Sequence, residues 1–424
     1  MSKVTITARD MRRHNRKTVL QQIYQRQPIS RLEVSQLSGL STGTVTTVVG
    51  ELLAEGIIQE VGFEASDGGR PRVLLSLKRD YGYVLGCELG ETRLTLQLFD
   101  VMLTRLASFH TALKDEEENT PEFVVDVLRQ GVAKLLTEAD APPEKVLGMG
   151  IGFPGVVEHS QNMRASSPIW HWEPIPLMAM LRQHFTFPLF LENGSKTMAL
   201  AERHATSIDN MAFVNIGIGV GAGIISGGKL YRGATDSAGE WGHTIIALDG
   251  APCRCGHYGC MEAYVGALGI LRTLRSHDPA SPFLRHHDPV VSLNEIVVAA
   301  QAGDATALQT LQETTHYLGA GVANLINLFN PSHVIIGGWV GLSLGPTIMD
   351  ELQKVVERYA LRLALDSVHL HISAVGPDAA SLGAALLAIE DFLARGGRMA
   401  AEENKSNRIQ ATHELSPYPL RTRP

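Results

Sequence analysis

Three of the four cysteines in this 424-residue chain lie within eight positions of one another, between residues 253 and 260. A histidine precedes them, which gives the spacing His243-x9-Cys253-x-Cys255-x4-Cys260. Three thiolates and one imidazole form a Cys3His donor set, which closes a tetrahedral zinc site and leaves no open position for catalysis. The polar residues between the cysteines do not suit free thiols buried in a core. The block therefore predicts a loop folded around one structural Zn2+, with His257 as the alternative to His243 for the fourth ligand.

The distribution of the cysteines also bears on the cellular compartment. Cysteines crowded into one loop do not form a disulfide framework, which favours a reducing environment. No apolar segment typical of a signal peptide follows Met1. The longest uncharged stretch, residues 315–349, is interrupted by asparagines, a proline and several glycines, which do not suit a lipid-facing helix. We therefore expect a cytoplasmic protein without membrane insertion.

The composition, with 44% hydrophobic and 19% charged residues, is that of a globular chain of two or three domains and excludes wholesale disorder. The net charge of −7 by itself gives no reason to expect nucleic acid as a partner. Residues 1–80, however, hold twelve lysines and arginines against eight acidic residues, a net of +4, which leaves −11 for the rest of the chain. A basic N-terminal segment on an acidic remainder indicates two separate tasks.

Helix and turn signals follow one another at short intervals in the first 80 residues. The apolar spacing in residues 15–24 predicts a helix. Ser30 opens a capping-box pattern that begins a second short helix, Gly39 ends it, and Ser41 can cap a third helix. Two short helices joined by a glycine-containing turn are typical of a helix-turn-helix. A hairpin across residues 57–75 would add a wing.

The third helix and the wing carry the side chains that could reach DNA. Hydroxyls at a helix N-terminus can contact phosphates, threonine methyls can contact thymine, and wing arginines can enter a minor groove. The predicted DNA contacts are Ser41, Thr42, Thr44, Thr46, Thr47, Arg70 and Arg72. The third helix contains no arginine, so sequence specificity would depend on DNA shape and on the wing. The alternative is a three-helix packing domain that binds no nucleic acid.

From residue 82 onward, strand-like and helix-like segments alternate in an α/β pattern. Four motifs follow in order: Gly86-Cys-Glu-Leu-Gly-Glu-Thr-Arg93, Leu191-Glu-Asn-Gly-Ser195, Gly217-Ile-Gly-Val-Gly-Ala-Gly223, and Gly239-Glu-Trp-Gly-His243 with the cysteine block that ends at Glu262. Together with the winged segment before them, these motifs resemble the ROK family of bacterial repressors and sugar kinases. The resemblance runs from about residue 10 to about residue 390. It implies an actin-like (ribonuclease H-like) body of the sugar-kinase type, with two lobes and a sugar site between them.

In ROK kinases, side chains of these motifs hold the hydroxyls of the sugar. Carried over to the matching positions, the resemblance implies Asn193, Glu240, His243 and Glu262 as sugar contacts, and it favours His243 as the metal ligand. Carboxylates and amides can each bind neighbouring hydroxyls, and a zinc-bound loop would hold Glu262 in place. The alternative for Glu240 is that it only caps a turn.

Three positions depart from the kinase pattern. ROK kinases have an aspartate after Glu-Asn, which takes the proton from the attacking sugar hydroxyl, whereas this chain has Gly194. Their first phosphate loop reads Asp-x-Gly-Gly-Thr, and here Glu91 replaces the second glycine with a negative charge. In the second phosphate loop, Ile218 replaces a threonine hydroxyl. The three losses predict a sensor that keeps the sugar pocket but is not an enzyme.

The expected domains are a winged helix-turn-helix at residues 1–80, a first lobe at 81–195 that a helix near 380–395 completes, a second lobe with the zinc loop at 196–379, and a disordered tail at 396–424. The aromatic segment Trp170-His-Trp172 either stacks on the sugar or packs in the interior.

Taken together, the residues and the resemblance predict a repressor of sugar uptake or metabolism genes. A sugar or sugar phosphate would bind the body, shift the populations of its conformations and release operator DNA. Two operator half-sites require two heads, so a homodimer or homotetramer is expected. Two alternatives stay open: an ATP-dependent sugar kinase fused to a DNA-binding head, and a repressor that a sugar-transport protein sequesters.

Overall fold

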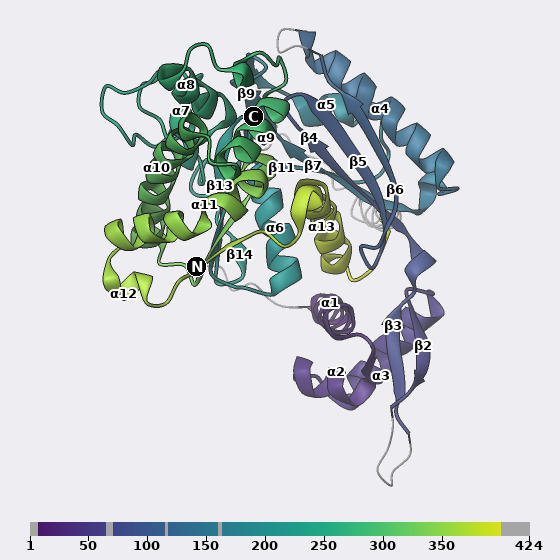
Figure 1. Cartoon of the computed structure of the whole chain (residues 1–424). Helices are drawn as coiled ribbons and strands as arrows, with labels where there is room; N and C mark the ends of the chain where they lie inside the picture. The colour runs from purple at the N-terminus through teal and green to yellow at the C-terminus, as the bar shows by residue number, and fades with distance from the viewer. Residues whose placement is uncertain (1–6, 65–70, 115–117, 160–162, 400–424) are drawn as a thin grey trace, which may run out of the picture.

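The chain consists of a small N-terminal head and a larger α/β body, which Figure 1 shows with the head below the body. The computed structural model describes residues 7–64, 71–114, 118–159 and 163–399. Among these residues, no helix is both long and apolar enough to cross a membrane.

The head is a three-helix unit with a three-stranded sheet in the order β1–β3–β2. Its elements are α1 (Ala8–Arg26), β1 (Ile29–Ser30), α2 (Arg31–Ser38), α3 (Thr42–Ala54), β2 (Ile58–Phe63) and β3 (Val73–Leu77). Ser30 forms the predicted capping box of α2, Gly39 ends that helix in the left-handed region at φ 69°, and the Ser41 side chain caps α3. The first helix begins at Ala8, earlier than predicted, because Thr7 forms a second capping box and the residues after it are too polar to show an apolar period.

The first sheet of the body has the strand order β11–β7–β4–β5–β6. Its strands are β4 (Tyr83–Leu89), β5 (Arg93–Asp100), β6 (Arg105–Ala112), β7 (Val146–Phe153) and β11 (Leu189–Asn193). Three consecutive strands are antiparallel, and β7 and β11 then run parallel to β4. Beside this sheet lie α4 (Pro121–Glu138), α5 (Leu177–Leu181) and a small sheet of β8 (Val156–Glu158), β9 (Arg164–Ser167) and β10 (Trp172–Ile175).

The second sheet of the body repeats this topology with the order β14–β13–β12–β15–β16. Its strands are β12 (Met211–Ile216), β13 (Val220–Ser226), β14 (Lys229–Leu230), β15 (His333–Gly337) and β16 (His369–Ile372). The accompanying helices are α7 (Glu262–Val265), α8 (Ala267–His277), α9 (Pro289–Gln301), α10 (Ala305–Phe329), α11 (Gly338–Tyr359) and α12 (Arg362–Leu365). Again three antiparallel strands precede two parallel ones, so the body is a structural repeat of two similar lobes.

Two helices, α6 (Gly194–Thr206) and α13 (Ala379–Ala394), lie between the two sheets in Figure 1. The backbone of α13 lies directly on β4 and β7, because Gly86 and Gly150 leave no side chain at the contact. A Cβ atom at either position would collide with carbonyl oxygens of α13. The α13 helix is therefore an integral part of the first lobe, although 185 positions, 194–378, separate it from β11.

The hydrophobic core of the head continues into the body. Leu20 and Ile23 of α1 belong to the same buried cluster as Phe392 and Leu393 near the end of α13. Figure 1 shows α1 directly below α13. The head and the body are therefore joined by apolar packing as well as by the chain connection.

The segment after α13 packs against the head. The buried Arg16 side chain donates to the carbonyl oxygen of Gly396 at 2.6 Å, and the Tyr81 hydroxyl donates to that of Gly397 at 3.2 Å. The prediction of a disordered tail from residue 396 is therefore wrong for residues 396–399. The sequence does not indicate this packing, because glycines form no apolar pattern and the residues that contact them lie more than 300 positions away. Residues 400–424 lie outside the described part of the chain.

Candidate functional site

A cavity of about 340 Å3 lies between the two lobes of the body. The four predicted sugar contacts, Asn193, Glu240, His243 and Glu262, all line it. They come together because β11 ends at Asn193, and because the loops after β14 and before α7 approach the turn between β12 and β13. We call this cavity the interlobe cleft.

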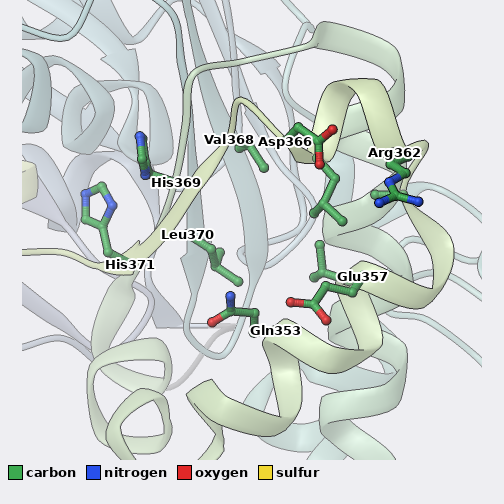
Figure 2. A pocket seen from close by; sticks show the side chains of 11 residues that line it. Gln353, Glu357, Arg362, Asp366, Val368, His369, Leu370 and His371 are labelled. Atoms are coloured by element: carbon green, nitrogen blue, oxygen red, sulfur yellow. The ribbon is translucent and has the colours of Figure 1, made fainter.

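A larger hollow of about 830 Å3 lies elsewhere, between α11, α12 and β16. Figure 2 shows its charged side chains, Glu357, Arg362 and Asp366, on the helical side, while His369 and His371 point away from Leu370. No predicted site residue lines this hollow. The interlobe cleft, which gathers the predicted residues, is therefore the candidate site.

The four predicted metal ligands meet beside the cleft. The donor atoms of His243, Cys253, Cys255 and Cys260 all lie within 4.8 Å of one another. The Sγ of Cys253 lies 3.7 Å from Nδ1 of His243, and the Sγ atoms of Cys255 and Cys260 are also 3.7 Å apart. Ligand atoms around tetrahedral Zn2+ are separated by roughly this distance, given Zn–S bonds of about 2.3 Å. The donor set and its spacing fit a four-coordinate zinc ion.

The alternative ligand, His257, lies outside this group of four, although its Nδ1 is 3.5 Å from the Sγ of Cys255. His243 reaches the thiols through Nδ1 and also lines the cleft. Its second ring nitrogen is therefore left for a contact in the cleft, which reconciles the two roles predicted for this residue.

Glu262 connects the cysteine loop to the glycine-rich turn. It begins α7 two residues after Cys260, and one carboxylate oxygen accepts from the backbone N–H of Val220 at 3.0 Å. The other oxygen lies 3.6 Å from the Sγ of Cys253. The loop that a metal would rigidify thus fixes the position of this carboxylate.

The side chains of Asn193 and Glu240 differ in how many hydrogen bonds they already make within the protein. The Asn193 side chain caps α6 with its oxygen and donates one N–H to the carbonyl of Gly155 at 2.9 Å, so one amide N–H is left for a ligand. The Glu240 carboxylate makes no capping hydrogen bond, although Glu240 precedes the short helical turn at residues 241–243. Burial raises the pKa of Glu240, which His243 and Lys196 oppose. The carboxylate of Glu240 is therefore available to a ligand in the cleft.

The two acidic residues of the first glycine loop are held differently. Burial raises the pKa of Glu88 to about 7, with Arg93 opposing the rise. Burial also raises the pKa of Glu91, but a hydrogen bond from Arg254 at 2.9 Å counteracts it. Arg254 belongs to the cysteine loop of the other lobe, so this ion pair crosses the cleft. No sequence pattern indicates this pair, because its members are 163 positions apart.

The aromatic segment packs in the interior. Trp170 and Trp172 are buried and contact Phe153 with ring centroids 5.9 and 5.8 Å away. Their indole N–H groups donate to the carbonyls of Glu91 and Asn119. Of the two alternatives, the structure therefore shows packing and not an aromatic platform for a sugar.

The hydroxyls of α3 are partly engaged within the helix. Thr46 and Thr47 donate to the carbonyls of Thr42 and Gly43 at 2.8 and 3.1 Å, and Thr44 contacts the Ser41 hydroxyl at 2.9 Å. Ser41, Thr42, Thr46 and Thr47 are exposed, and Thr44 is half-buried. Donation of Thr46 or Thr47 to a phosphate would require their hydroxyls to leave these carbonyls.

The wing is described only in part. Arg72 is exposed and lies 3.4 Å from Glu64, whereas Arg70 lies outside the described residues. The exposed arginines of α1, Arg9 and Arg12, add positive charge to the head that the pattern of the third helix did not indicate. The charge count of residues 1–80 includes both arginines, but their polar surroundings did not indicate that they belong to a helix.

Comparison with known protein families assigns both parts of the chain. Residues 84–391 match the ROK family, and residues 12–59 match a winged helix-turn-helix DNA-binding family. The chain belongs to the ROK family. This membership confirms the resemblance seen in the motifs.

Two relatives cover about nine tenths of the chain, and a third covers its body. A xylose repressor from Bacillus spizizenii is 30% identical over 89% of this chain and 96% of its own length. The crystal structure of a ROK family transcriptional regulator, a homologue of the E. coli MLC protein, superimposes with a TM-score of 0.77 at 27% identity, covering 91% of this chain and 98% of that one. A ROK glucokinase from Streptomyces griseus in complex with glucose and AMPPNP gives a TM-score of 0.62 at 29% identity, covering 73% of this chain and all of that one. The predicted α/β fold, a winged head on an actin-like sugar-kinase body, is thereby confirmed.

Proposed function

We propose that this ROK protein is a DNA-binding repressor of sugar uptake or metabolism genes, and that a sugar in the interlobe cleft controls its affinity for operator DNA. One observation carries this proposal: a winged helix-turn-helix shares its core with a body whose cleft is lined by all four residues predicted to contact a sugar. The xylose repressor that matches over 96% of its length supports it.

The cleft offers hydrogen-bonding groups suited to hydroxyls. Glu240 and Glu262 provide acceptors, Asn193 provides an N–H, and His243 provides its second ring nitrogen. Carboxylates that bind two neighbouring hydroxyls fix the orientation of a polyol ligand. We assign these four residues as the sugar contacts.

The Cys3His cluster would hold one structural zinc ion per chain, which metal analysis of the purified protein would detect. Its four protein ligands leave no open coordination position, so the ion would stabilise the loop that carries Glu262. A substantially lower zinc content after purification without chelators would contradict this assignment.

Phosphoryl transfer is not expected from this cleft. Gly194 begins α6 at the cleft wall and has no side chain that could accept a proton from a sugar hydroxyl. Glu91 adds a carboxylate near the glycine-rich turn, where it would repel a triphosphate. The family includes glucokinases, so these local losses carry the argument against catalysis.

The α13 helix is the proposed route from sugar to DNA. Ala380 near its N-terminus lines the cleft, and Phe392 and Leu393 near its C-terminus lie in the core shared with the head. A sugar that changes lobe closure would move this helix and with it the head. In a homodimer or homotetramer, such a movement changes the spacing of two recognition helices and thus their fit to two half-sites.

The experiment is a DNA-binding titration of the full-length, zinc-loaded protein against its own promoter region, with and without a panel of sugars. We expect one sugar to weaken DNA binding at least tenfold, and Glu240→Gln to lose the response while keeping DNA binding. Exposed Glu173 provides the matched control variant, Glu173→Gln, which should respond like the unchanged protein.

Two results would contradict the proposal. The first is ATP-dependent phosphorylation of a sugar that Glu240→Gln abolishes, since the body would then be a kinase. The second is release of DNA only when a sugar-transport protein is added, since the cleft would then not be the sensor.

A further inference from the structure

The interlobe cleft contains an ion pair whose members come from opposite lobes. Glu91 lies in the turn between β4 and β5 of the first lobe, and Arg254 lies in the cysteine loop of the second. Their side chains are only 14% and 27% exposed, and Nη1 of Arg254 lies 2.9 Å from the Glu91 carboxylate. A contact this enclosed holds both side chains more firmly than an ion pair on the surface would.

The carboxylate of Glu91 also lies against the glycine-rich turn. The backbone N–H of Gly219 forms a hydrogen bond to it, and a side chain at Gly219 would collide with one of its oxygens. A backbone amide in a glycine-rich turn together with an arginine is an arrangement that attracts anions. In this chain, the anion in that position is part of the protein.

Arg254 is neutralised from a second side as well. Its Nη2 lies 3.7 Å from the carboxylate of Glu262, one of the assigned sugar contacts. Among the described residues that line the cleft, the carboxylates are Glu88, Glu91, Glu240 and Glu262, and the guanidinium groups are Arg93 and Arg254. The carboxylates of Glu91 and Glu262 on either side of Arg254 make this part of the cleft unfavourable for a phosphorylated ligand.

We propose that the pair formed by Glu91 and Arg254 makes the cleft selective for an uncharged sugar over the corresponding sugar phosphate. The carboxylate of Glu91 fills the anion position, so a phosphate would have to displace it or lie beside it. Hydroxyls of an uncharged sugar, in contrast, donate to Glu240 and Glu262 without meeting a like charge. This inference rests on the proposed function and specifies the class of its effector.

Isothermal titration calorimetry of the full-length, zinc-loaded protein tests the inference. The probes are glucose, N-acetylglucosamine and xylose, each compared with its own terminal phosphate ester. For the sugar that binds, we expect the uncharged form to bind at least tenfold more tightly than its phosphate ester. Glu91→Gln should reduce this preference at least tenfold, because Arg254 then loses one of its carboxylate partners.

Two control variants separate the local effect from charge and folding. Glu91→Asp keeps the negative charge and should keep the preference for the uncharged sugar. Glu173→Gln removes one exposed charge from the same lobe and should also keep it. Thermal unfolding of each variant checks that it is folded. If Glu91→Gln does not fold, Glu91→Ala, which also removes the carboxylate, replaces it and should show the same reduced preference.

The outcomes distinguish this inference from the proposed function. Tighter binding of a sugar phosphate, or an unchanged preference in folded Glu91→Gln, would overturn the inference and leave a sugar-responsive repressor intact. Binding of neither member of any pair would overturn the proposed function together with the inference.

Discussion

At the scale of single residues, the cleft differs from the kinase pattern at positions that bear on its chemistry. Gly194 has no side chain that could act as a base, while the Glu240 carboxylate makes no hydrogen bond that caps the helical turn after it. Glu91 replaces a glycine of the kinase pattern and pairs with Arg254 across the cleft. These side chains support the proposal that the cleft binds hydroxyls and does not transfer a phosphoryl group.

Glu88 gives the chain a measurable pH dependence. Its folded-state pKa is about 7, mainly because of burial, so the folded protein keeps a proton that the unfolded chain has lost between about pH 5 and pH 7. The stability contribution of this group therefore falls as the pH rises through that window. At pH 8, Glu88→Gln should raise the free energy of unfolding by about 2 kcal/mol, a value reduced from the full shift because part of the side chain is exposed.

Urea unfolding at pH 5 and pH 8 measures this effect. The advantage of Glu88→Gln should shrink at pH 5, where the native carboxyl group is protonated. Glu144→Gln, at an exposed position, is the control and should show no such dependence. An equal effect of Glu88→Gln at both pH values would contradict the raised pKa.

At the scale of secondary-structure elements, α13 and the residues after it join the head to the body. The helix lies against β4 and β7 through Gly86 and Gly150, and it ends in the core of the head. Arg16 of α1 then binds the carbonyl of Gly396. The end of the chain thus contributes to the stability of its beginning.

Arg16 and Arg12 provide a matched test of this connection. Both arginines lie on α1 and pair with Glu51, but the Arg16 side chain is 4% exposed and that of Arg12 is 72% exposed. Arg16→Ala should lower the free energy of unfolding by about 3 kcal/mol, because it leaves Glu55 and the Gly396 carbonyl without their partner. Arg12→Ala should have little effect, because exposed ion pairs contribute little. Chemical unfolding measures both values. Similar decreases in the free energy of unfolding for the two variants would show that the contact between Arg16 and Gly396 does not stabilise the fold.

At the scale of the whole molecule, two lobes of the same topology enclose the cleft, and one helix extends from the cleft to the head. In the proposed function, this arrangement would connect a sugar bound in the cleft to the DNA-binding head through α13. A sugar can move the head in this way only if the body populates two arrangements of its lobes and the sugar binds one arrangement more tightly than the other.

Hydrogen exchange measured by mass spectrometry tests the connection in solution. A saturating sugar that binds the cleft should change exchange in α13 and α1. It should leave α4 and α9 unchanged, because α4 packs on β5 and β6, α9 packs on α10 and α11, and neither helix contributes a residue to the cleft lining. Protection confined to residues that line the cleft would show that α13 does not transmit the signal.

Much of the site and of the head was predictable from the sequence, because the interactions involved are local. The caps at Ser30 and Ser41 depend on residues three positions away, and the four metal donors lie within 18 positions of one another. The start of α1 at Ala8 was missed, since a polar helix end has no apolar period. The order of residues 396–399 was missed because glycines show no pattern until their partners are known.

The sequence by itself determined the winged head, the Cys3His donor set and the glycine at position 194, because each depends on residue types at short spacing. Only the tertiary structure decided that Glu91 meets Arg254 and that α13 ends in the core of the head. Those contacts join residues hundreds of positions apart or in different lobes. They exist because two sheets close around a cleft and the chain returns to its own N-terminal domain, which no local pattern encodes.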